Sequence, residues 1–105
     1  MTDALVVLTT LPTPEAAAEL AKAVVGEKLA ACANIVPGLR SVYRWQGKVQ
    51  DESEVLVFLK TRRDRFAQLR AKILELHPYE VPEVIAVSVD QGHEAYLDWI
   101  IRETG

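Results

Sequence analysis

The sequence is poor in cysteine, and Cys32 is the only one in the chain. A single cysteine excludes an intrachain disulfide and any CxxC pair, so we expect neither a disulfide framework nor a closed zinc site within one chain. A glycine-rich phosphate loop is also missing, which removes the usual nucleotide-binding motifs. No apolar run approaches the roughly 20 residues that a membrane-spanning helix needs.

Basic residues are in the minority, with 12 Lys and Arg against 15 Asp and Glu and a net charge of -3. This balance argues against nucleic acid as a partner. The first residues lack a basic segment followed by a long apolar stretch, so we expect a cytoplasmic protein without membrane contact. A chain of this length predicts one domain over residues 1–105.

The longest β-favouring stretch lies in the middle of the chain. Two extended runs, Ala31 to Trp45 and Ser53 to Thr61, are joined by a polar turn at residues 46–48 and its neighbours. The pattern predicts a β-hairpin whose strands, at about 3.3 Å per residue, extend beyond a small domain. At residues 55–59 apolar side chains occupy both faces of the strand, whereas a two-layer domain covers only one. We therefore expect an oligomer.

The other elements follow from hydrophobic periodicity and helix caps. We expect a strand over Ala4–Thr10, a helix from Pro14 to Gly26 capped by Thr13, a helix over Arg62–Leu76, a strand over Val84–Val89 and a helix over His93–Glu103. This order predicts the α+β class, as a ferredoxin-like split β-α-β sandwich with an extra C-terminal helix and a long central hairpin.

Two residues are candidate metal ligands. His77 stands between a helix and a connector stiffened by two prolines, and its neutral imidazole suits Cu(II) or Zn(II). The alternative is a helix-end residue whose cation favours the carbonyl terminus. Cys32 is the softest donor and as a thiolate would bind Cu(I). Its alanine neighbours give an apolar setting with no adjacent base or cation, which favours an inert buried thiol. Further ligands, such as Glu80 or Glu83, would have to come from a neighbouring subunit.

Aromatic residues are candidates for a small-molecule cleft. Trp45, Tyr43, Tyr79 and Trp99 are large enough to line one, with Lys60 supplying a charge at the end of its strand. The alternative is packing between subunits. The basic run at residues 62–65 is interpreted as a solvated first turn of a helix.

Two long strings, LAACANIVPGLRSVYRWQGKVQ and LHPYEVPEVIAVSV, resemble the CutA family of divalent-cation tolerance proteins. The resemblance runs from Val6 to Trp99. It implies a ferredoxin-like fold, a homotrimer assembled through the long hairpins, and copper binding with tolerance to divalent metals in the cytoplasm. It also favours an inter-subunit cleft near Trp45, Lys60 and Tyr79.

The resemblance further implies a metal site built from a cysteine late in the first strand and a His-His dipeptide before the connector. In this chain these positions hold Thr9, Leu76 and His77, so only His77 matches.

Our first hypothesis for function is a cytoplasmic homotrimer that binds a divalent cation, copper foremost, through His77 and Cys32. It would be no enzyme, because no spacing supports a Cys32 and His77 catalytic pair, and it would hold no organic cofactor. The alternative is a signalling trimer similar to the PII regulators, which binds a small anionic metabolite beside Lys60. A stable trimeric scaffold is a third interpretation.

Overall fold

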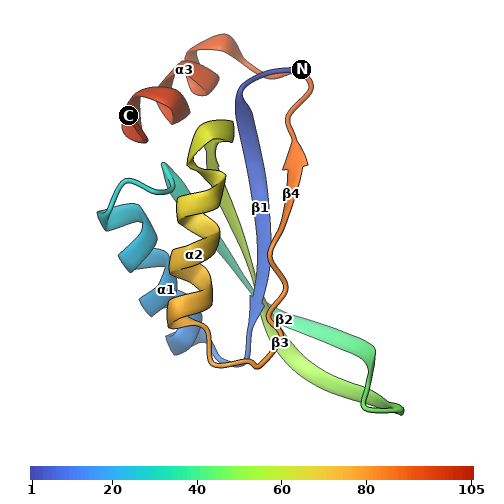
Figure 1. Ribbon diagram of the computed structural model, residues 1–105. Helices are drawn as coiled ribbons and strands as arrows, with labels where there is room; N and C mark the ends of the chain where they lie inside the picture. The colour runs from blue at the N-terminus through green and yellow to red at the C-terminus, as the bar shows by residue number, and fades with distance from the viewer.

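The computed structural model describes residues 1–105 and has the α+β architecture that the sequence predicts. The elements are β1 (Ala4–Leu11), α1 (Pro14–Gly26), β2 (Cys32–Trp45), β3 (Lys48–Arg62), the 3-10 turn η1 (Arg63–Arg65), α2 (Phe66–Leu76), β4 (Ile85–Ser88) and α3 (Glu94–Glu103). The strands form one antiparallel sheet in the order β2-β3-β1-β4. Figure 1 shows α1 and α2 on one side of this sheet and α3 beyond the end where β1 begins. The ferredoxin-like order with an extra C-terminal helix is confirmed.

The main core lies between the sheet and helices α1 and α2. Val55, Val57 and Leu59 of β3 are 0–3 % exposed and belong to the same core cluster as Leu69 and Ile73 of α2. These alternate residues face the helices because successive strand residues point to opposite sides of a sheet. The apolar residues between them therefore face the other side, as the sequence predicts.

The sheet face opposite α1 and α2, called the open face below, is also apolar. Residues directly opposite each other in the ladder share a face, and Leu8 is opposite both Phe58 and Ile85. Ile85 and Val87 of the edge strand β4 are 51 % and 52 % exposed. The open face therefore presents apolar side chains that α1 and α2 do not cover.

The hairpin turn is tighter than the sequence pattern indicates. Gln46 and Gly47 have φ angles of 50° and 77°, which is the left-handed geometry of a two-residue hairpin turn. The ladder therefore resumes at once, with Trp45 opposite Lys48. The prediction that the second hairpin strand begins at Ser53 is wrong, because β3 begins at Lys48.

A bulge in β2 bends the hairpin away from the sheet. The register between β2 and β3 shifts between Val36 and Leu39, where Gly38 has a φ of 80° that favours glycine. Pro37 has no N–H to donate to the ladder at this point. Figure 1 shows the hairpin projecting beyond the rest of the sheet, and the molecule measures 44 × 25 × 23 Å. The predicted overhang is therefore present.

The predicted helix over Arg62–Leu76 and strand over Val84–Val89 are both too long. Arg62 is the last residue of β3, opposite Ala4, and α2 begins only at Phe66 after the 3-10 turn. The strand β4 is one residue shorter at each end. None of the helices is long and apolar enough to cross a membrane.

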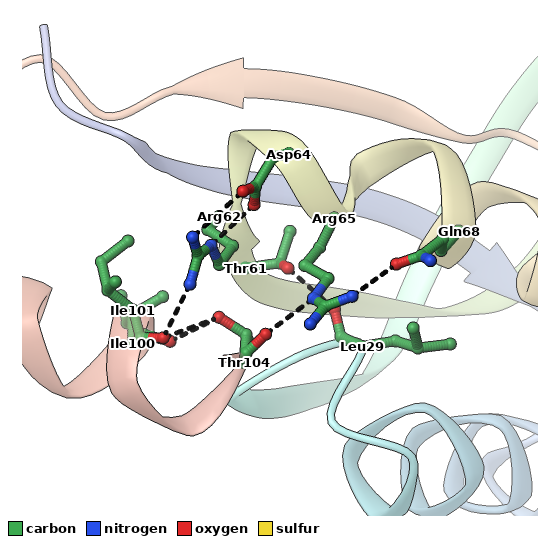
Figure 2. Close-up of polar contacts among 9 residues, drawn as sticks. All are labelled: Leu29, Thr61, Arg62, Asp64, Arg65, Gln68, Ile100, Ile101 and Thr104. Carbon is green, nitrogen blue, oxygen red and sulfur yellow. Dashed lines mark hydrogen bonds and ion pairs between the residues drawn. The ribbon is translucent and has the colours of Figure 1, made fainter.

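The arginines at residues 62–65 do not form a solvated helix turn, because they bind the two ends of the chain. Figure 2 shows the contacts of Arg62 and Arg65 with the C-terminal end. Arg65 Nε donates to the Thr104 carbonyl at 2.7 Å, and Arg62 Nη1 donates to the Ile101 carbonyl at 3.4 Å. Arg63, which is outside that view, donates to the Thr2 carbonyl at 3.0 Å. These contacts fasten α3 and the N-terminal segment to the end of the sheet.

Candidate functional site

A cleft of about 810 Å³ lies between the projecting half of the hairpin and the connector that follows α2. The bend in β2 carries the hairpin away from the sheet, while Pro78 and Pro82 keep the connector from becoming helical. The cleft is lined by Thr10, Leu39, Arg40, Ser41, Val42, Tyr43, Trp45, Glu54, Leu56, Pro78, Tyr79, Glu80, Val81 and Glu83.

His77 joins the connector to the end of β1, next to the cleft. The Tyr79 N–H donates to His77 Nδ1 at 3.1 Å, so the proton of the neutral ring is on Nε2, which donates to the Thr10 carbonyl at 2.7 Å. The residue is 8 % exposed, and burial is the main reason why the pKa of His77 is lowered. Both ring nitrogens are therefore used within the chain, and His77 accepts a metal only by giving up one of these contacts.

Tyr79 links the connector to β3. Its hydroxyl donates to Glu54 Oε2 at 2.7 Å, and Glu54 is 9 % exposed. Burial, followed by the hydrogen bond to this carboxylate, raises the pKa of Tyr79. The phenol therefore stays protonated and holds one oxygen of Glu54 in a fixed position on the cleft wall.

The hairpin side of the cleft carries two further polar pairs. The Arg40 guanidinium donates to both carboxylate oxygens of Asp51, at 2.8 and 2.7 Å. The Tyr43 hydroxyl donates to Glu52 Oε1 at 2.6 Å, and this bond raises the pKa of Tyr43. The one cation of the lining is thus matched by a carboxylate beside it.

Of the three residues predicted to share a cleft, two lie in it. Trp45 and Tyr79 both line the cleft of one chain, whereas Lys60 does not. Lys60 is opposite Cys32 in the ladder, and its ammonium lies 5.5 Å from the centre of the Tyr96 ring. This is the α3 end of the open face, six residues along β3 from Glu54, or roughly 20 Å at strand spacing.

Cys32 has a more polar setting than its alanine neighbours indicate. It is partly exposed, and its Sγ lies 3.7 Å from the Tyr96 hydroxyl. The expectation of no adjacent cation is wrong, since Lys60 is its cross-strand partner and Cys32 contributes to raising the pKa of Lys60, after the larger effect of Tyr96. Trp99 stacks against Tyr96 with ring centres 5.6 Å apart and takes no part in the cleft.

The structure does not bring the predicted metal ligands into one site. His77 contacts the end of β1 at Thr10, whereas Cys32 lies at the Lys60 end of the sheet. Thr9 is fully buried, and Leu76 is 42 % exposed with no donor atom in its side chain. No group of three or more His, Cys, Asp or Glu side chains in the chain is arranged to hold a metal ion.

Sequence reasoning overlooked Glu54 and Arg40 as cleft residues. Glu54 directly precedes the apolar run of β3 and shares a face with Leu56 by strand alternation, which marks it as a carboxylate at a semi-buried position. Its partner Tyr79 is distant in sequence, so the pairing itself had no local signal. Arg40 lies in a segment whose outward bend depends on the bulge.

The chain is similar over nearly its whole length to proteins of one family. The family model described as CutA1 divalent ion tolerance protein matches residues 5–103. The "Divalent-cation tolerance protein CutA" of Thermus thermophilus is 50% identical over 95% of this chain and 97% of its own length, and a solved structure from that organism gives a TM-score of 0.94 at 49% identity, covering 97% of this chain and 99% of that one.

Two further proteins with CutA in their names are also similar to this chain. The chloroplastic CutA protein of Arabidopsis thaliana is 48% identical over 95% of this chain, which spans about half (55%) of that longer protein. A structure described as the periplasmic divalent cation tolerance protein CutA of Archaeoglobus fulgidus has a TM-score of 0.94 at 33% identity, covering 97% of this chain and 99% of that chain. The chain therefore belongs to the CutA1 family of divalent ion tolerance proteins.

Proposed function

We propose that this protein is a cytoplasmic homotrimer that binds a divalent cation, Cu(II) foremost, as a binding protein in metal tolerance rather than as an enzyme. The names of its relatives supply the link to divalent cations. The observation that carries the proposal for this chain is the charge of the cleft.

The cleft wall favours cations over anions. It carries the carboxylates of Glu54, Glu80 and Glu83, and its single basic residue, Arg40, is paired with Asp51. A wall of this sign raises the local concentration of cations and opposes an anion. The alternative of a small anionic metabolite is disfavoured for the same reason, and also because Lys60 lies at the other end of the sheet.

The donor types favour Cu(II) over Cu(I). The cleft offers carboxylate and phenol oxygens, and the imidazole of His77 lies next to it, in contact with the lining residues Thr10 and Tyr79. Among divalent metals, Cu(II) has the highest affinity for sites of nitrogen and oxygen ligands. The thiol of Cys32 is the only soft donor, and it contacts Tyr96 and Asn34 rather than the cleft. We propose His77 as a ligand that exchanges its Tyr79 contact for the metal, and Cys32 as a ligand only with donors from another copy.

The open face and the hairpin support assembly. Ile85 and Val87 on the open face, and Val42 and Val49 on the hairpin, are 51–66 % exposed. Apolar side chains gathered in this way mark interaction surfaces. We propose that three copies cover them, as the family resemblance implies, and that the trimer completes the metal site with ligands from a second subunit.

The cytoplasm is the proposed location because the protein carries one free thiol and no disulfide, which suits a reducing compartment. The Archaeoglobus relative is described as periplasmic, so cell fractionation is the appropriate test. Recovery of the protein in the periplasmic or secreted fraction would contradict this part of the proposal.

Titration with Cu(II) tests the metal-binding proposal. We expect the double variant Glu80→Gln/Glu83→Gln and the variant His77→Ala to bind Cu(II) at least about tenfold more weakly, since each loses donors of the proposed site. The control Glu19→Gln removes an exposed carboxylate from α1 and keeps the affinity of the parent protein. Unchanged Cu(II) affinity in both the double variant and His77→Ala would refute the cleft as the metal site.

Sedimentation of the same samples tests the assembly. We expect a species of three times the 11.7 kDa chain mass. A folded species with the mass of one chain at micromolar concentration would exclude the trimer and the shared site together.

A further inference from the structure

The cleft contains more than a metal ion would use. Three aromatic residues, Tyr43, Trp45 and Tyr79, share one cavity with the carboxylates of Glu80 and Glu83. A divalent ion is held by its oxygen and nitrogen ligands and gains little from aromatic rings or aliphatic walls. The rings therefore indicate that the cleft suits an organic ligand.

The aromatic residues offer ring surface and not hydroxyl donors. The hydroxyls of Tyr79 and Tyr43 already donate to Glu54 and Glu52, at 2.7 and 2.6 Å. In a single chain Trp45 and Tyr43 are 37 % and 40 % exposed. By strand alternation both rings lie on the face of the hairpin opposite Val42 and Val49, so other copies can cover those valines and leave part of each ring open to a ligand. Aromatic ring faces attract cations through their quadrupole and also pack against methylene groups.

The charged groups of the cleft that remain unpaired are acceptors. The guanidinium of Arg40 is occupied by both oxygens of Asp51. Glu80 and Glu83 are exposed and form no ion pair or side-chain hydrogen bond within the chain. A ligand for this wall must therefore bring positive charge, and several carboxylates around one cavity favour more than one charge.

We propose that the cleft binds an organic cation, an aliphatic amine with two or more positive charges, whose ammonium groups pair with Glu80 and Glu83 while its methylene chain and one ammonium lie against Trp45 and Tyr43. The volume of about 810 Å³ falls within the range of small-molecule sites. This inference goes beyond metal binding and does not depend on it, because an amine uses the rings and Cu(II) does not.

The test is calorimetric titration of the full-length protein with spermidine at near-physiological salt, with Mg²⁺ and uncharged 1,8-octanediol as comparison ligands. We expect spermidine to bind more tightly than either comparison ligand, because only spermidine combines charge with an aliphatic chain. Absence of spermidine binding, or Mg²⁺ binding as tight as that of spermidine, would overturn the proposal.

Variants separate the contribution of the rings from that of the charges. Trp45→Leu should weaken spermidine binding by about three- to fivefold, the usual effect of one exposed cation–π contact, and leave the Cu(II) affinity unchanged. Glu80→Gln/Glu83→Gln should weaken spermidine binding by about tenfold. The control Tyr96→Leu removes an exposed ring outside the cleft and should leave the spermidine affinity unchanged.

Sedimentation confirms that each variant keeps the assembly of the parent protein, and Tyr43→Leu replaces Trp45→Leu if that variant does not. Spermidine affinity that is unchanged both in the ring variant and in the double carboxylate variant refutes the amine site, whatever the result with Cu(II). The two proposals therefore fail on different measurements.

Discussion

Removal of the Arg65 guanidinium should loosen the C-terminal helix. In Arg65→Met the aliphatic stem is kept, but the Nε donor to the Thr104 carbonyl at 2.7 Å and the Nη1 donor to Gln68 at 2.8 Å are lost (Figure 2). Thr104 is fully buried, so its carbonyl has little access to a replacement from water. A hydrogen bond to a charged group contributes about 1.5–3 kcal/mol. The exposed bond to Gln68 adds little to this.

We expect Arg65→Met to lower the free energy of unfolding by about 2 kcal/mol, because Arg65 is only half buried. For a chain of this size that corresponds to a fall in Tm of roughly 10 °C. Guanidinium unfolding measures the loss, and hydrogen exchange of the amides of α3 shows where it occurs. The matched control is Arg70→Met, because the one contact of this exposed guanidinium is with the Phe66 ring, 5.7 Å away. Equal losses in the two variants would refute the proposed role of Arg65.

Three further predictions concern buried polar groups. Thr9→Val should raise the free energy of unfolding by about 1 kcal/mol, because the buried Thr9 hydroxyl has no hydrogen-bond partner. Thr61→Val should lower it, because the Thr61 hydroxyl donates to the Leu29 carbonyl at 2.7 Å. A change of the same sign for both variants in denaturant unfolding would contradict this prediction. Because burial lowers the pKa of His77, the unfolded chain takes up the proton first, and stability should fall as the pH drops below about 6.5. His77→Gln should remove this slope between about pH 5 and 7, the control His93→Gln should keep it, and identical slopes would disprove the assignment. Because the pKa of Tyr79 is raised, the free energy of unfolding should fall as the pH rises above about 10, where the phenol of the unfolded chain ionises. In Tyr79→Phe, denaturant unfolding at a series of pH values should show a smaller fall. The same pH dependence as in the parent protein would contradict this prediction.

The fold could be predicted from the sequence because its signals are local. Thr13 caps α1 by accepting from the Ala16 N–H at 3.1 Å, and the alternation of Val55 to Leu59 gives both faces of β3. The start of β3 could not be predicted, because residues 48–52 are polar apart from Val49 and resemble a loop in composition. Their strand conformation depends on pairs with β2, such as Arg40 with Asp51, which appear only once the two-residue turn sets the register.

The site was less accessible to sequence reasoning, because it depends on where side chains lie along the strands. Trp45 and Tyr79 were predicted together and line one cleft, but Lys60 was grouped with them and lies at the opposite end of the sheet. Composition indicates that these residues suit a cleft and gives no distance between them. The bulge at Gly38 decides which part of β2 turns toward the connector, and a Pro-Gly pair alone does not give the direction of that bend.

The cleft and the overhang have one physical origin, so ligand binding and assembly should be linked. The register shift between Val36 and Leu39 that opens the cleft also carries Val42 and Val49 into solvent, at 63 % and 66 % exposed. An isolated two-stranded hairpin is only marginally stable, so this wall of the cleft is held mainly by its own ladder until other subunits pack against the opposite face of the hairpin, which carries Val42 and Val49. A ligand that binds the ordered wall stabilises the assembled form by mass action. Affinity for a cleft ligand should therefore fall when the protein is diluted until it dissociates, and an affinity independent of association would show that a single subunit already orders its hairpin.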